Sequence, residues 1–112
     1  MTLLLSQPSV SLEAQGRTLK VSGDVDVSAA AELAAAGVKW LKSCGLNEAA
    51  FDFTAVSTAS SVAISVLFEW MRTCSSQKIV IESIVLSAPL MRLASLAELD
   101  ELIAHPSAAL SA

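Results

Sequence analysis

Charged side chains are scarce in this 112-residue sequence, and their scarcity excludes several classes of protein. Only 16% of the residues are charged and 54% are hydrophobic, whereas disordered chains are rich in charge and poor in aliphatic residues. The net charge is −4 and the seven basic residues are scattered along the chain, so no basic patch for nucleic acid or a membrane surface is visible. The composition predicts one folded globular domain.

Long apolar runs, cysteine and histidine are also nearly absent. No run approaches the ~20 apolar residues that cross a bilayer, and the N-terminus, Met-Thr-Leu-Leu-Leu-Ser-Gln-Pro, lacks the basic flank of a signal peptide. Cys44 and Cys74 are the only cysteines, which we interpret as reduced core or helix residues. His105 is the only histidine, which argues against a zinc site. We therefore expect a cytoplasmic protein without metal or cofactor.

Alternation, helical periodicity and turn residues predict the elements in the order strand, strand, helix, strand, helix, strand, helix. The expected strands are 10–14, 18–22, 49–53 and 78–84, and the expected helices are 29–41, 61–74 and one that opens at 87–89 and runs through 96. Ser28 is a candidate cap for the first helix, Gly45 can end it, and Ser87 with Pro89 fits the start of the third. This order predicts an α/β domain with a mixed sheet.

We expect four or five strands in that sheet, with the helices packed on one face, because each helix has a single core stripe. The whole chain, 1–112, is interpreted as one domain with an ordered part of about 9–103. The tail after Ile103 has the composition of a frayed end.

The helix expected at 61–74 carries three stripes rather than two. They are Ile64, Leu67, Phe68 and Met71 on the core side, the polar residues Ser61, Ser65, Glu69 and Arg72, and the apolar residues Val62, Val66 and Trp70 roughly opposite the core stripe. An apolar ridge opposite the core indicates a docking surface for a partner. The other interpretation is that the ridge packs against neighbouring helices, and the sequence leaves both open.

Hydroxyl residues crowd the loop before this helix, from Ser57 to Ser61. A helix N-terminus has free N–H groups and partial positive charge, so it favours anions and hydrogen-bond acceptors. One interpretation is that Ser60 or Ser61 only caps the helix. Alternatively, an exposed hydroxyl here is phosphorylated or contacts a partner.

Several segments resemble the signature of STAS domains. The segments are Gly23-Asp24-Val25-Asp26, Phe51-Asp52-Phe53-Thr54-Ala55-Val56, Ser60-Ser61-Val62-Ala63-Ile64, and the run from Pro89 to Leu99. The resemblance extends from about Val10 to Ile103 and implies the STAS fold. It places Ser61 at the family's regulatory Ser or Thr and Asp26 at its acidic residue near that site. Ser60 stands where the family pattern has Asp, which weighs against phosphorylation of Ser61.

The run Ser60-Ser61-Val62-Ala63-Ile64-Ser65, with Met71-Arg72 at the end of the helix, is most similar to the MlaB-type branch, also named for toluene tolerance. That resemblance implies a subunit bound to the ATPase of an inner-membrane ABC transporter that maintains outer-membrane lipid asymmetry. It also implies a location peripheral to the inner membrane. The partner-binding residues would be Ser60, Ser61, Val62, Ser65, Val66 and Glu69.

The alternative function is that of an anti-sigma-factor antagonist, a phospho-switch at Ser61. An enzyme is not expected, because a serine nucleophile needs an adjacent base and nothing in the sequence places His105 near Ser61.

Overall fold

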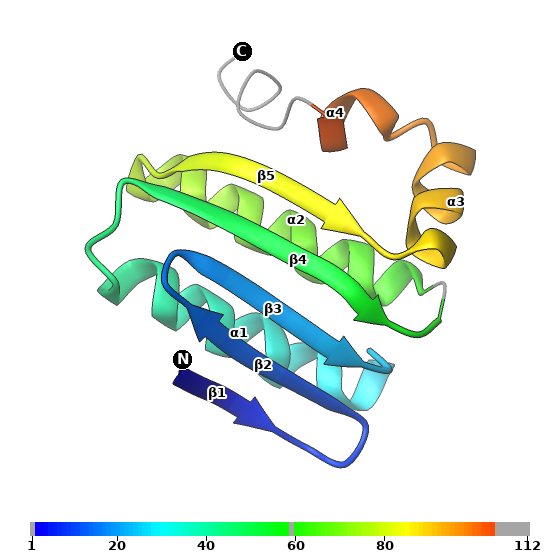
Figure 1. Ribbon diagram of the computed structural model, residues 1–112, viewed down its shortest axis with the longest axis horizontal. Helices are drawn as coiled ribbons and strands as arrows, with labels where there is room; N and C mark the ends of the chain where they lie inside the picture. The colour runs from blue at the N-terminus through cyan, green and yellow to red at the C-terminus, as the bar shows by residue number, and fades with distance from the viewer. Residues whose placement is uncertain (1, 59, 105–112) are drawn as a thin grey trace.

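A computed structural model describes residues 2–58 and 60–104, which form a five-stranded mixed sheet with helices (Figure 1). The strands are β1 (Thr2–Ser6), β2 (Val10–Gln15), β3 (Thr18–Gly23), β4 (Glu48–Val56) and β5 (Val80–Leu86), and the helices are α1 (Val27–Ser43), α2 (Ser61–Gln77), α3 (Ala88–Leu96) and α4 (Asp100–Ala104). The strands lie in chain order across the sheet. β1, β2 and β3 pair antiparallel, and β3, β4 and β5 pair parallel, so the expected mixed sheet is confirmed.

The helices α1 and α2 lie side by side behind the sheet, and α3 and α4 lie beyond its β5 side (Figure 1). α1 connects β3 to β4 and α2 connects β4 to β5, so both crossovers advance in the same direction across the sheet. Crossovers between parallel strands are right-handed in nearly all proteins, and two that advance in one direction must therefore cover the same face. This topology makes α1 and α2 neighbours along their whole length.

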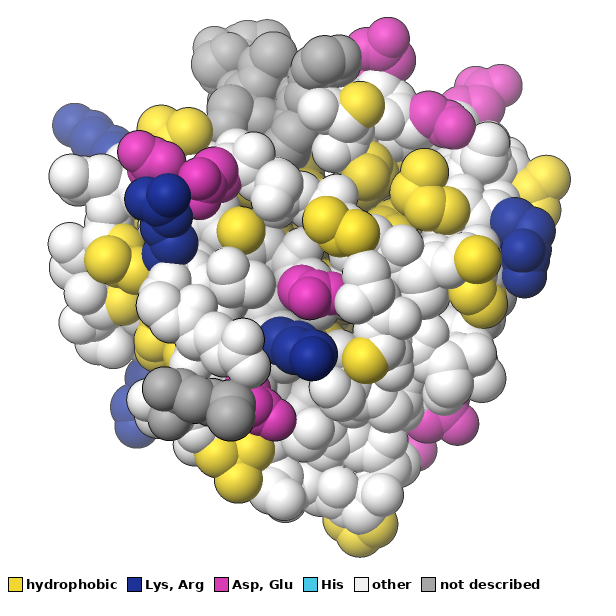
Figure 2. All heavy atoms as spheres, in the orientation of Figure 1, with side chains coloured by type: hydrophobic (Ala, Val, Ile, Leu, Met, Phe, Trp, Pro, Cys, Tyr) yellow, Lys and Arg dark blue, Asp and Glu magenta, His cyan; other side chains and the backbone are white. Residues whose placement is uncertain are grey.

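The core lies between the sheet and these two helices. Phe51 and Phe53 of β4 each lie with the ring centroid 5.6 Å from that of Trp70 in α2, and all three side chains are buried. The opposite face of the sheet is open, with charged and other polar side chains interspersed among hydrophobic ones (Figure 2). On the open side, Arg17 forms an ion pair with Glu82 at 2.9 Å and lies 3.7 Å from Glu48. The sheet therefore buries one face.

The first strand, β1, was not predicted from the sequence. Its three consecutive leucines do not alternate with polar residues, so they lack the period-2 pattern of a half-buried strand. A register shift between Leu3 and Leu5 in the pairing with β2 explains the irregular pattern, because a bulge turns successive side chains out of strict alternation. Leu4 and Leu5 pack partly buried against the core, and Leu3 is exposed.

Other boundaries differ by a few residues. β4 continues to Val56 rather than ending at residue 53, and α2 continues to Gln77 rather than ending at residue 74. Lys78 ends α2 in the left-handed conformation, with φ 58°. β5 begins at Val80 rather than Lys78. A short separate helix, α4, follows α3. The tail and His105 lie outside the described residues.

The positions of the helix starts were predicted closely, but the residues that cap the helices were not always predicted correctly. The cap of α1 is Asp26, not Ser28: an Asp26 carboxylate oxygen accepts from the backbone N–H of Ala29 at 2.9 Å, and the Ser28 hydroxyl donates to the same oxygen at 2.8 Å. Ser60 caps α2. Ser87 holds the cap position of α3, with proline in the first turn, but its side chain makes no capping hydrogen bond. Asp26 rather than Ser28 caps α1 because a charged carboxylate accepts a stronger hydrogen bond than a neutral hydroxyl does.

Candidate functional site

Most of the apolar ridge of α2 is buried. Trp70 is 0% exposed and Val66 is 3% exposed, so the expectation that these side chains point to solvent is wrong. The indole N–H of Trp70 donates to the backbone carbonyl of Ala34 in α1 at 3.1 Å. The ridge packs against α1, which was the other interpretation that the sequence left open. Val62, at the start of the ridge, is only partly buried.

Gly37 of α1 is what allows this packing. A Cβ atom built on Gly37 would lie 2.2 Å from Nε1 of Trp70, closer than any real contact. Only glycine therefore fits beside the indole ring. A glycine inside an alanine-rich helix costs about 1 kcal/mol of helix stability relative to alanine. The presence of such a glycine was the signal in the sequence that another side chain packs closely against α1 at this position.

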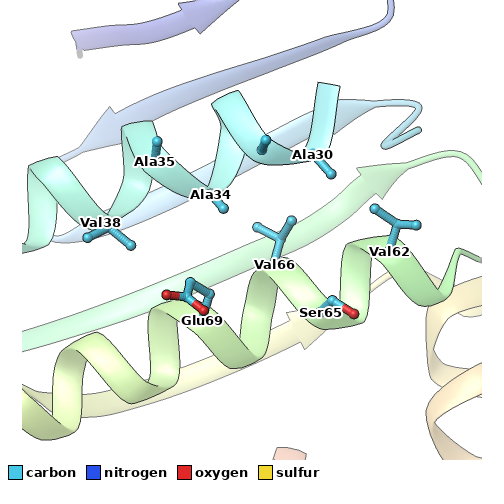
Figure 3. Close-up of a pocket in the computed structure, with 9 residues that line it drawn as sticks. Ala30, Ala34, Ala35, Val38, Val62, Ser65, Val66 and Glu69 are labelled. Atoms are coloured by element: carbon cyan, nitrogen blue, oxygen red, sulfur yellow. The ribbon is translucent and has the colours of Figure 1, made fainter. Parts of the chain in front are cut away.

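The two helices leave a groove between their outer faces (Figure 3). It has a volume of about 450 Å³. The lining residues are small or apolar except Glu69, and they are Ala30, Ala31, Ala34, Ala35 and Val38 of α1 and Val62, Ser65, Val66 and Glu69 of α2. Figure 3 shows the valines of α2 pointing toward the alanine-rich face of α1. Val66, although buried, contributes to the floor, so part of the apolar ridge does reach a surface.

A second hollow continues the groove toward the C-terminal ends of the two helices. It has a volume of about 510 Å³ and shares Val38 and Glu69 with the first. Its other lining residues are polar or charged, namely Lys42, Arg72, Thr73, Ser75 and Ser76. The groove is therefore apolar where the helices begin and polar where they end. The two hollows together form the α1–α2 groove.

At the N-terminal end of the groove, the loops after β3 and β4 are joined by hydrogen bonds. The Ser60 hydroxyl donates to the backbone carbonyl of Val25 at 3.0 Å and accepts from the N–H of Ala63 at 3.4 Å. The Thr58 hydroxyl donates to the carboxylate of Asp24. Ser60 therefore has a structural role, because its hydroxyl caps α2 and also joins the two loops.

Ser61 is the first residue of α2, and its side chain is exposed. Its backbone carbonyl accepts from the Ser65 hydroxyl at 3.1 Å, while its own hydroxyl makes no hydrogen bond within the described residues. The bond from Ser60 to Val25 joins the residues that directly precede Ser61 and Asp26. The structure thus brings these two sequence-predicted site residues to the same end of the groove.

Asp26 is exposed and ionised there. The hydroxyl of Ser28 and, after it, the backbone N–H of Ala29 hold the pKa of the Asp26 carboxyl below its ordinary value of 3.8. Glu69, half-buried in the middle of the groove, forms an ion pair with Arg72 one turn later in α2. The charged groups of the site are therefore arranged along the groove rather than in one cluster.

Of the six sequence-predicted partner-binding residues, three line the groove with an accessible side chain, namely Val62, Ser65 and Glu69. Ser61 is exposed one helical turn before Ser65 on the same face of α2. The α1 wall of the groove was missed. Its alanines were interpreted only as helix formers, although Ala31 and Ala35 are exposed and recur with helical spacing. That repeat of small, exposed side chains was the signal available in the sequence.

Among residues 2–58 and 60–104, no three His, Cys, Asp or Glu side chains gather as a metal site requires. None of the helices in that part of the chain is long and apolar enough to span a bilayer. Burial raises the pKa of the Cys74 thiol to about 12, with a smaller contribution from Cys44, so Cys74 is a neutral core side chain and no nucleophile.

A comparison with protein-family models matches residues 9–104 to the family described as Mlab, STAS domain. The match covers the whole fold from the turn before β2 to the end of α4, and it includes every residue that lines the α1–α2 groove. A search of curated proteins finds no matching relative.

Proposed function

The chain belongs to the MlaB-type STAS family, and from this premise we propose that it binds the ATPase of an ABC-type phospholipid transporter. STAS domains are typically binding modules without enzymatic activity. In the proposed role, the domain stays at the cytoplasmic side of the inner membrane through its partner and supports the ATPase. The transporter maintains the lipid asymmetry of the outer membrane.

The observation that carries the proposal is the α1–α2 groove. The open sheet face is mixed in character, whereas the groove joins an apolar floor to exposed small side chains such as Ser65, and the exposed Ser61 lies one helical turn before Ser65 in α2. Small side chains let another backbone approach closely, and an apolar floor supplies the area whose burial drives association. Four of the six residues that the family resemblance assigns to partner binding line the groove, namely Val62, Ser65, Val66 and Glu69.

A binding role also agrees with the chemistry of the groove. In the part of the chain that the structure describes, the Ser61 hydroxyl makes no hydrogen bond to a side chain that could act as a base, and neither thiol lines the groove. Hydrolysis and phosphoryl transfer need an acid, a base and a nucleophile that converge on one point. We expect the purified chain to turn over no ATP on its own, and measured turnover by the isolated domain would contradict this.

The direct test is co-expression with an ABC transporter ATPase encoded by the same genome. The expected result is one complex that survives affinity purification and gel filtration, with ATP turnover that depends on the presence of the domain. The ATPase of an unrelated ABC importer serves as the control for specificity. Failure of the two chains to associate at micromolar concentration would contradict the proposal.

The second candidate is the phospho-switch, which the exposed Ser61 hydroxyl favours. A phosphate at the first turn of α2 would lie beside free backbone N–H groups and the positive end of the helix dipole. Incubation with ATP and a serine kinase encoded beside the gene would then label the parent protein but not Ser61→Ala. Absence of label, together with a stable ATPase complex, would favour the transporter subunit.

A further inference from the structure

We propose that the α1–α2 groove takes an amphipathic helix of the partner, oriented by charge, with its acidic end at Lys42 and its basic end at Asp24 and Asp26. This rests on the proposed function and names the partner segment that the same site would recognise. Three observations carry it: the satisfied backbone of the groove walls, its length, and the opposite charge of its two ends.

The walls of the groove favour an occupant whose backbone N–H and C=O groups are hydrogen-bonded within its own segment. Both walls are α-helices, whose N–H and C=O groups are paired internally except at the ends. The groove therefore offers no edge with which an extended segment could form a ladder of hydrogen bonds. An unpaired peptide group that is buried against apolar side chains costs several kcal/mol, on the order of 2–7. A helix avoids this penalty and lays its apolar face into the groove.

The length of the groove corresponds to about four turns of helix. Val27, which is 79% exposed, lies one turn before Ala30 on the same face of α1 and extends the apolar floor. Lys42 lines the other end. The fifteen residue steps from Val27 to Lys42 span about 22 Å, because an α-helix rises 1.5 Å per residue. A partner helix of roughly 15 residues would cover the groove from end to end.

The two ends carry opposite charge. Asp24 and Asp26 are exposed at the N-terminal end, where, among the described residues, their carboxylates accept from hydroxyl and backbone donors and form no salt bridge. At the C-terminal end, Lys42 is exposed and makes no salt bridge within the described residues. Lys39 lies one turn earlier and is also exposed. Glu69 and Arg72 neutralise each other between the two ends.

This arrangement fixes a direction. A partner helix with its basic end at Asp24 and Asp26 and its acidic end at Lys42 would meet opposite charge at both ends, and the same helix turned end to end would meet like charge. Charge of this kind at the rim of an interface sets register and suppresses wrong partners more than it adds affinity. The groove therefore selects one orientation of its occupant.

Photo-cross-linking on the complex with the ATPase tests the geometry. A photoreactive phenylalanine analogue is placed at Val27 in one variant and at Ser76, which lines the opposite end, in another. The expected cross-links fall in one helix of the ATPase, about 15 residues apart, with Asp or Glu in the turn nearest Ser76. Cross-links to separate segments, or to one helix with Lys or Arg in that turn, would overturn the proposal.

Charge reversal on the same complex tests the electrostatics. Lys42→Glu should weaken binding about fivefold to tenfold at low salt and by less at high salt, because rim charges are screened. Arg92→Glu is the matched control, because Arg92 is exposed in α3, away from the groove. Equal affinity of both variants would overturn the inference and leave the proposed function intact. If the parent protein binds no ATPase, both are overturned.

Discussion

At position 37, an alanine Cβ would lie 2.2 Å from Nε1 of Trp70. Gly37→Ala gains about 1 kcal/mol of helix propensity, but the overlap forces the indole or the helix to move, which costs typically 1–3 kcal/mol or more. We expect net destabilisation in urea unfolding. The double variant with Trp70→Phe should lose much less from the added methyl group. A Gly37→Ala protein as stable as the parent would contradict the packing described.

Cys74 gives the fold a dependence on alkaline pH. Its thiol pKa is raised from 9.0 to about 12 in the folded state, so between these values the folded chain keeps a proton that the unfolded chain loses. The contribution is fully present below pH 9 and is lost as pH rises toward 12, at up to about 1.4 kcal/mol per pH unit.

The measurement is the free energy of unfolding in urea at pH 8 and pH 10. The parent should lose more stability between these values than Cys74→Ala, which has no thiol at 74 to titrate. Alkylation at pH 8 should label Cys44, which is half-buried, and leave Cys74 unmodified until the protein unfolds. Equal pH dependence in the two proteins would show that Cys74 is not desolvated.

At the scale of the element, α2 shows how far helical periodicity reaches. The stripe predicted as core is buried at Ile64, Leu67 and Met71 and partly buried at Phe68. The stripe that ends in Trp70 was ambiguous, because periodicity gives the angle of a side chain around its own helix but not the position of the next helix. Gly37 and Trp70 lie far apart in sequence, and only the fold brings them together. The α1 wall of the groove was missed for the same reason.

At the start of α2, the adjacent residues Ser60 and Ser61 have different roles. Ser60→Ala removes a hydroxyl that caps the helix and also donates to Val25, so it should cost about 1–2 kcal/mol. Ser61→Ala removes an exposed hydroxyl and should change stability by less than about 0.5 kcal/mol. Thermal unfolding of the two variants side by side checks the assignment. Equal losses, or a larger loss at Ser61, would contradict it.

At the scale of the whole molecule, the order of elements predicted the topology because the constraints on crossovers leave few alternatives. The mixed sheet and the two helices on one face follow from that order and from the apolar patterns. The β1 strand was missed because its bulge hides the alternation, and Asp26 was missed as a cap because Ser28 offered a local alternative. Patterns within each segment therefore predicted the strands, the helices and their order. The groove could not be predicted, because it forms only where α1 and α2 pack against each other.

The central claim is that the domain acts by docking through the α1–α2 groove, and Ser61→Arg tests it most directly. The arginine would project from an exposed position in the first turn of α2, one turn before the groove residue Ser65. Folding should therefore lose at most about 1 kcal/mol, from a positive charge at a helix N-terminus. Binding should lose about 2–5 kcal/mol, because the side chain blocks close approach and buries an unpaired charge. Ser83→Arg, on an exposed site of β5, is the control.

The measurement is the dissociation constant of each variant for the purified ATPase, alongside its thermal midpoint. We expect Ser61→Arg to melt close to the parent and to bind at least about 30-fold more weakly, while Ser83→Arg binds as the parent does. If Ser61→Arg binds the ATPase as tightly as the parent protein does, docking at this end of the groove is contradicted, because Ser61 would then lie outside the interface. A Ser61→Arg protein that fails to fold would contradict the exposure of Ser61 on which the account depends.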